Sequence, residues 1–72
     1  MTNAAQDISN LIHTCDTENL IGIAKHIIGY EPDANDVESD CGESILEECD
    51  FILENFISNS ELLKLYRQIF KN

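Results

Sequence analysis

Tryptophan is absent from this 72-residue chain, methionine occurs once, and Lys and Arg together number only four. Nucleic-acid binding takes most of its affinity from basic side chains that neutralise phosphates, and aromatic rings add stacking on the bases. Anionic membrane surfaces likewise attract basic segments. Fourteen acidic residues give a formal net charge of −10. This balance disfavours direct binding to nucleic acid or membrane and favours a basic protein as partner.

Long apolar runs are also missing, since no segment approaches the roughly 18 consecutive apolar residues of a membrane span. The first seven residues, MTNAAQD, lack the positive and apolar regions of a secretory signal. The three cysteines, Cys15, Cys41 and Cys49, are odd in number and widely spaced, unlike a disulfide framework. We therefore expect a cytoplasmic protein with reduced thiols.

The apolar residues that are present recur at spacings of three and four, which is typical of amphipathic helices. A first helix is predicted over about 4–15, capped by Thr2 or Asn3, and a second follows the break at Asp16. Gly29 is suited to end the second helix in a left-handed conformation. With no repeat or low-complexity tract, residues 1–72 are expected to form one acidic helical domain.

The last helix is predicted to start at Ser58, because Ser58 and Glu61 have the spacing of a capping box. Between Glu31 and Ser44 two interpretations stay open. Apolar residues continue at helical spacing from Ala34 to Phe56, which favours one long helix over about 33–57, weakened at Gly42. The alternative is a short helix, a break and a main helix from Glu43. The fold prediction is thus an all-α, small single-domain bundle of three to four helices.

The acidic residues are concentrated, with ten between Glu31 and Glu54 and no Lys or Arg among them. On a helix, four of these carboxylates form one stripe opposite the apolar face, namely Glu43, Glu47, Asp50 and Glu54. Like charges so spaced repel by a few tenths of a kcal/mol per pair. A basic partner would relieve that repulsion. The alternatives are a merely solvated face, or neutralisation by Lys64, Arg67 and Lys71 of the last helix. The predicted partner-binding residues are Asp36, Glu38, Asp40, Glu43, Glu47, Glu48, Asp50, Phe51 and Glu54.

Phe51 is an aromatic residue among acidic neighbours, outside the apolar arc of its helix. An exposed aromatic ringed by polar groups is typical of a binding hot spot. Tyr30 is a second candidate anchor. The alternative is that another helix or the N-terminal arm covers Phe51, which would make it a core residue.

Motifs of catalysis or metal binding do not occur. A calcium-binding EF-hand needs oxygen ligands at alternating positions and Gly at the sixth, which the acidic segment lacks. The cysteines have no paired zinc-ligand spacing and fall on apolar stripes, so we expect core thiols. Acidic surroundings would also blunt their reactivity. We expect no catalytic residues, no metal, no cofactor and no enzyme activity.

The leading functional hypothesis is a small acidic inhibitor or regulator that occupies a basic surface, such as that of a nuclease or another nucleic-acid-binding protein. Immunity proteins, antitoxins and phage-encoded anti-defence inhibitors share this size, charge and helicity, although no motif links the chain to any of them. The first alternative is a self-associating subunit or homodimer, using apolar residues such as Ile21, Leu63 and Phe70. An acyl-carrier-like protein modified at Ser44 is the remaining alternative, based on a weak match to a Ser that follows an acidic residue.

Overall fold

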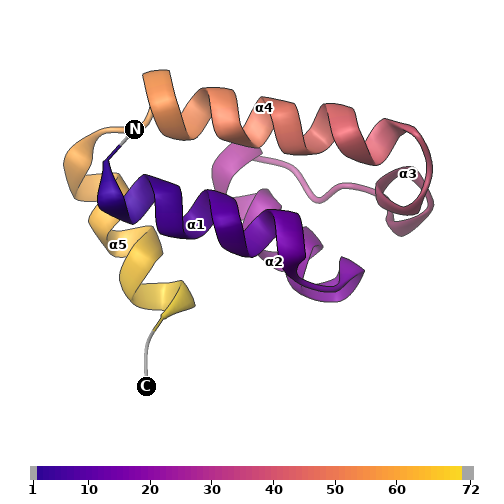
Figure 1. Ribbon diagram of the computed structural model, residues 1–72, viewed down its shortest axis with the longest axis horizontal. Helices are drawn as coiled ribbons and strands as arrows, with labels where there is room; N and C mark the ends of the chain where they lie inside the picture. Colours follow the sequence, from indigo (N-terminus) through magenta and orange to yellow (C-terminus); the bar gives the residue numbers. More distant parts are fainter. Residues whose placement is uncertain (1, 71–72) are drawn as a thin grey trace.

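A computed structural model describes residues 2–70 of the chain, and in this range it is all-α, as predicted. Five helices follow one another within these residues and are joined by short connections (Figure 1). α4 lies above α1 and α2. α5 follows the C-terminal end of α4 and descends beside the start of α1. The helices are α1 (Asn3–Thr14), α2 (Thr17–Ile28), α3 (Ala34–Glu38), α4 (Cys41–Asn55) and α5 (Asn59–Ile69).

Local capping explains where most helices begin, and these predictions are confirmed. The Thr2 side chain accepts a hydrogen bond from the backbone N–H of Ala5 at 3.2 Å. Asp16 and Ser58 do the same at the starts of α2 and α5, at 2.9 and 3.2 Å. α2 ends at Gly29, whose φ of 85° lies in the left-handed region that glycine tolerates.

The long helix predicted over 33–57 is wrong, because the chain leaves the helical conformation at Ser39, where φ is −97° and ψ is −174°. The Ser39 hydroxyl donates to the carbonyl of Asp36 at 2.9 Å and accepts from the backbone N–H of Cys41 at 3.2 Å. Serine side chains can compete in this way with the helical hydrogen bonds of the backbone. The break therefore lies before α4, and Gly42 is inside the first turn of that helix.

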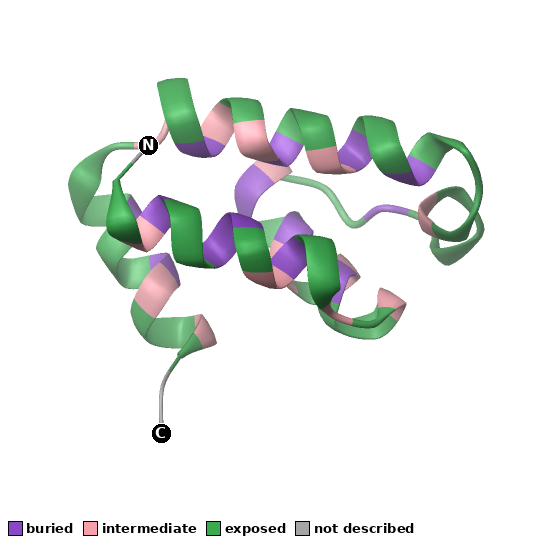
Figure 2. Ribbon diagram, in the orientation of Figure 1, coloured by how far each residue is buried: buried purple, intermediate pink, exposed green. Residues whose placement is uncertain are grey.

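The core lies where α1, α2, α4 and α5 turn their apolar sides toward one another (Figure 2). Burial of this surface is the main favourable term in folding. The residues with the least exposure include Ile8 and Ile12 of α1, Ala24 of α2 and Cys49 of α4. The buried apolar residues are Ala5, Ile8, Ile12, Leu20, Ala24, Ile27, Ile45, Cys49, Leu53, Leu62 and Leu65.

Two residues predicted on the apolar face lie outside the core. Phe56 is 70% exposed, because α4 ends at Asn55 and the chain then turns, so that Ile57 packs against the core in its place. Cys41 is exposed because the break at Ser39 removes it from the predicted continuous stripe. Of the three expected core thiols, Cys49 is buried and Cys15 is half-buried.

Gly42 is buried where α3 packs on α4, and a Cβ at this position would overlap the carbonyl oxygen of Val37. Gly42→Ala should therefore lower the free energy of unfolding by about 1–3 kcal/mol, as overpacked sites do. Gly22→Ala is the matched control, because nothing lies within 4 Å of a Cβ there. Helix preference alone should make this control more stable by up to about 1 kcal/mol. Urea denaturation at low protein concentration measures both, and equal effects of the two variants would contradict the predicted contact.

Candidate protein-binding surface

Eight of the nine predicted partner-binding residues are exposed, and they lie on α3, α4 and the turn between them. The outer side of α4 is exposed along its whole length in Figure 2. α3 packs directly against α4, so the acidic residues of both helices form one exposed surface. We call the following seven residues the acidic surface: Asp36, Glu38, Asp40, Glu43, Glu47, Glu48 and Glu54.

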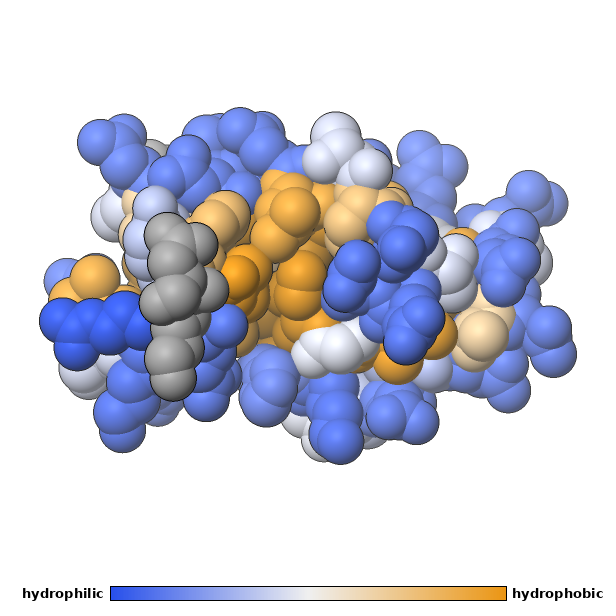
Figure 3. Space-filling model, turned by 90° about the horizontal axis from the view of Figure 1, so that it is seen from below, coloured by the Kyte–Doolittle hydropathy of each residue, from blue (hydrophilic) through white to orange (hydrophobic). Residues whose placement is uncertain are grey.

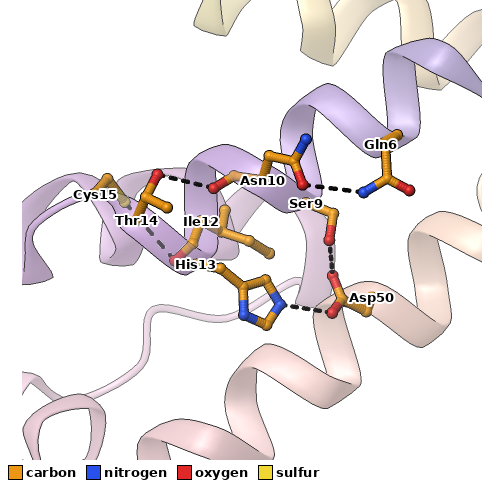
Figure 4. A network of polar contacts seen from close by, with 8 residues as sticks. All are labelled: Gln6, Ser9, Asn10, Ile12, His13, Thr14, Cys15 and Asp50. Carbon is orange, nitrogen blue, oxygen red and sulfur yellow. Dashed lines mark hydrogen bonds and ion pairs between the residues drawn. The ribbon is translucent and has the colours of Figure 1, made fainter.

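Asp50 is the exception, because its carboxylate faces α1 and is half-buried. The buried Ser9 hydroxyl donates to one carboxylate oxygen at 2.7 Å, and Nε2 of His13 lies 2.7 Å from the other (Figure 4). The prediction that Asp50 lies on a stripe opposite the core is therefore wrong. This carboxylate fixes α4 against α1 and is already occupied within the protein.

Serine, aspartate and histidine also form hydrolytic triads, but their order differs here. In a triad the histidine accepts the serine proton and the aspartate orients the histidine. Here Asp50 lies between the other two, so the Ser9 hydroxyl donates to a carboxylate and has no imidazole as its base (Figure 4). Ser9 is also 7% exposed, which leaves little access for a substrate. The network is suited to holding two helices together.

Asp50→Ala removes the acceptor for the Ser9 hydroxyl and leaves that buried group unpaired. Unfolding free energy should fall by about 1–3 kcal/mol, the usual cost of an unsatisfied buried polar group. Asp50→Asn keeps an acceptor oxygen and should cost less. Glu47→Ala, on the exposed side of the same helix, should change stability by no more than about 0.5 kcal/mol. Chemical denaturation of the three variants checks this order, and equal losses for Asp50→Ala and Glu47→Ala would rule out the network as a clamp.

Phe51 is exposed to solvent. No helix within residues 2–70 covers it, and its exposed fraction is 55%. The ring of Phe56 stands edge-to-face against it, with ring centres 5.1 Å apart and planes 71° apart. Aromatic pairs favour this geometry because the positive edge of one ring meets the negative face of the other. We call Phe51 and Phe56 the aromatic pair. The sequence alone does not indicate that Phe56 is the second ring of this pair, because its position depends on the turn that ends α4.

Tyr30, the other proposed anchor, is 53% exposed and lies in the segment between α2 and α3. It stacks with no other ring among residues 2–70, where the ring pairs are Phe51 with Phe56 and Tyr66 with Phe70. Ser44, the residue considered for a carrier arm, is exposed on α4. Only two residues, Cys15 and Asp16, separate α1 from α2.

Internal neutralisation of the acidic surface is not observed in the part of the chain that the structure describes. The ion pairs there join His13 to Asp50 at 2.7 Å and Lys25 to Glu31 at 4.0 Å. Lys64 and Arg67 lie on α5, which packs mainly on α1, and pair with no carboxylate within residues 2–70. Lys71, the third member of the predicted basic cluster, lies outside the described residues. The seven carboxylates therefore face solvent with no paired cation among residues 2–70.

Thiol chemistry in this protein is governed by burial and by neighbouring carboxylates. Burial, and then the charges of Asp50 and Glu48, raise the pKa of the Cys49 thiol from its ordinary 9.0 to about 12. Burial and the nearby Asp16 also raise the pKa of Cys15. A nucleophilic cysteine needs the opposite, a lowered pKa in a positive environment. Within residues 2–70, no three His, Cys, Asp or Glu side chains are grouped so that they could hold a metal ion.

Alkylation by iodoacetamide at pH 8 should label Cys41 first, Cys15 more slowly, and Cys49 only after unfolding, because the reagent needs an accessible thiolate. Mass spectrometry of the peptides gives the order. The raised pKa of Cys49 also links stability to pH, because burial disfavours its thiolate in the folded state. The contribution of this thiol to stability is fully present below pH 9 and is lost as the pH rises from 9 toward 12. Stability should therefore fall over that interval, with a smaller fall in Cys49→Ala. Early labelling of Cys49 in the folded protein would contradict its buried position.

Comparison of the chain with protein families, with curated proteins and with solved structures gave no match. Its function is therefore argued from its own residues. Among residues 2–70, no helix has both the length and the apolar character needed to cross a membrane.

Proposed function

We propose that this protein is a small inhibitor or regulator that binds a basic surface of another protein through its acidic surface and aromatic pair. The observation that carries the proposal is the solvent-exposed pair of Phe51 and Phe56 among the exposed carboxylates of α4. Two large apolar rings that cover each other only edge-on still leave most of their area in water. Contact with a partner would remove that area from water at about 25 cal/mol per Å².

The acidic surface supports a basic partner, because seven carboxylates that pair with no cation within residues 2–70 create a field of one sign. Complementary fields accelerate encounter and select partners by charge. A nuclease or another nucleic-acid-binding protein offers such a basic surface, since it binds phosphates through Lys and Arg. The carboxylates would then take the place of nucleic-acid phosphates, and affinity should fall as salt concentration rises.

The rigidity of α4 supports the aromatic pair as an anchor. Phe51 lies one residue from Asp50, whose bonds to Ser9 and His13 hold α4 on α1. Cys49 and Leu53, on the opposite side of the same helix, are buried in the core. An anchor whose backbone is already fixed loses little conformational freedom on binding, and this preserves affinity.

Affinity capture compares the tagged wild-type chain with Phe51→Ala and with Leu63→Ala, using lysate of the source cells and quantitative mass spectrometry. Leu63 is a matched control, because it is a similarly exposed apolar residue, 50% exposed, on α5. A basic partner should be lost from Phe51→Ala and retained by Leu63→Ala. With the purified partner, Phe51→Ala should raise Kd roughly 30-fold or more, as hot-spot truncations of 2 kcal/mol or more do.

A second pair of variants isolates the charge. Glu47→Gln with Glu54→Gln removes two charges from the acidic surface, whereas Glu18→Gln with Glu61→Gln removes two charges elsewhere. The first should slow association and reduce its salt dependence, and the second should change both less. Retention of the same proteins by every variant, or capture of no basic protein, would refute the proposed function.

A further inference from the structure

The side of the molecule turned away from α4 carries a hollow between α1, α2 and α5, with a volume of about 540 Å³. Hydrophobic side chains gather in the middle of this side, surrounded by hydrophilic ones (Figure 3). Leu11, Cys15, Ile23 and Ile69 line the hollow, and each remains partly exposed to solvent. These apolar side chains are therefore incompletely covered by residues 2–70.

Gly22 lies at the middle of α2 and lines this hollow. Glycine is a poor residue for the middle of a helix, and alanine would be better. No packing contact within residues 2–70 explains the glycine, because beyond its own helix backbone and chain neighbours no atom there lies within 4 Å of the place where a Cβ would be. A glycine on an exposed helical surface permits close approach of another backbone. The position therefore fits a second helix that crosses α2 at Gly22.

The polar residues on either side of Gly22 identify that second helix. Glu18 lies four residues before Gly22 and His26 four residues after it, and both line the hollow. Each is thus about 6 Å from Gly22 along the helix axis, at 1.5 Å per residue. In an antiparallel pair of identical helices crossing at Gly22, Glu18 of each copy faces His26 of the other. A symmetric dimer makes every contact twice in this way.

We propose that two copies of this chain pair antiparallel along α2, with the two-fold axis at Gly22, and so cover the apolar hollow. Lys64 and Glu61 line the adjoining hollow together with His26. The acidic surface is on α3 and α4, which contribute no residue to the hollow. The dimer would therefore carry two acidic surfaces directed away from the contact, and this pairing does not depend on the proposed function.

Sedimentation equilibrium of the full chain in 0.5 M NaCl measures the pairing, because high salt screens the mutual repulsion of two acidic molecules. The wild type should form dimers at 100 µM. Gly22→Gln should weaken association at least tenfold, because a long side chain fills the crossing point. Its melting temperature by circular dichroism should not fall, because glutamine is a better helix former than glycine. A wild-type chain that stays monomeric at 1 mM would overturn the proposal.

Charge reversal tests the antiparallel register independently of folding. His26→Glu should weaken the dimer, because two like charges then face each other across the contact. The double variant Glu18→Lys with His26→Glu places opposite charges across the contact and should recover association. Failure of the double variant to recover, with a fold intact by circular dichroism, would overturn the register. A dimer that survives Gly22→Gln but is lost in Leu63→Ala with Phe70→Ala would place the contact on α5 and overturn the proposal.

Discussion

The packing of α4 on α1 decides which side chains the molecule presents to solvent. Cys49 and Leu53 bury one side of α4 in the core, and Asp50 fixes its rotation through the Ser9 hydroxyl and His13. A helix fixed on one side must expose the other, because its side chains keep fixed angular positions. Phe51 and the carboxylates of α4 consequently face water, and the acidic surface follows from the same contact that stabilises the fold.

The parts of the fold that depend on local chemistry could be predicted from sequence. Ser58 caps α5 through a neighbour three residues away, and Gly29 ends α2 by its own backbone conformation. For residues 31–44 the sequence leaves two interpretations open and favours the wrong one, because apolar spacing outweighs the single Ser39 hydroxyl that breaks the helix. The sequence alone places Asp50 on the solvent side of its helix, because its hydrogen-bond partner Ser9 lies 41 residues away in the chain. Phe56 was assigned to the core because the end of α4 at Asn55 was not foreseen.

The candidate site was predictable to the same extent. Composition and helical periodicity located the acidic surface and the unusual position of Phe51, since both depend only on residue type and angular position. The second ring of the aromatic pair needs the turn after α4, which brings Phe56 within 5.1 Å of Phe51. The hollow beside Gly22 needs three helices at once, because α1, α2 and α5 all contribute to it. Surfaces made by several elements depend on tertiary packing, which a single sequence does not specify residue by residue.

The acidic surface and the apolar hollow beside Gly22 differ in chemistry, so binding to each should respond differently to salt. Carboxyl footprinting tests whether the acidic surface binds a basic partner. Carbodiimide-activated labelling of Asp and Glu is compared between the free protein and its complex with a captured basic partner. Complex formation should protect Glu47, Glu48 and Glu54 of α4, while labelling of Glu61 on α5 should be unchanged. Equal labelling of the α4 carboxylates in both states would contradict a binding role for the acidic surface.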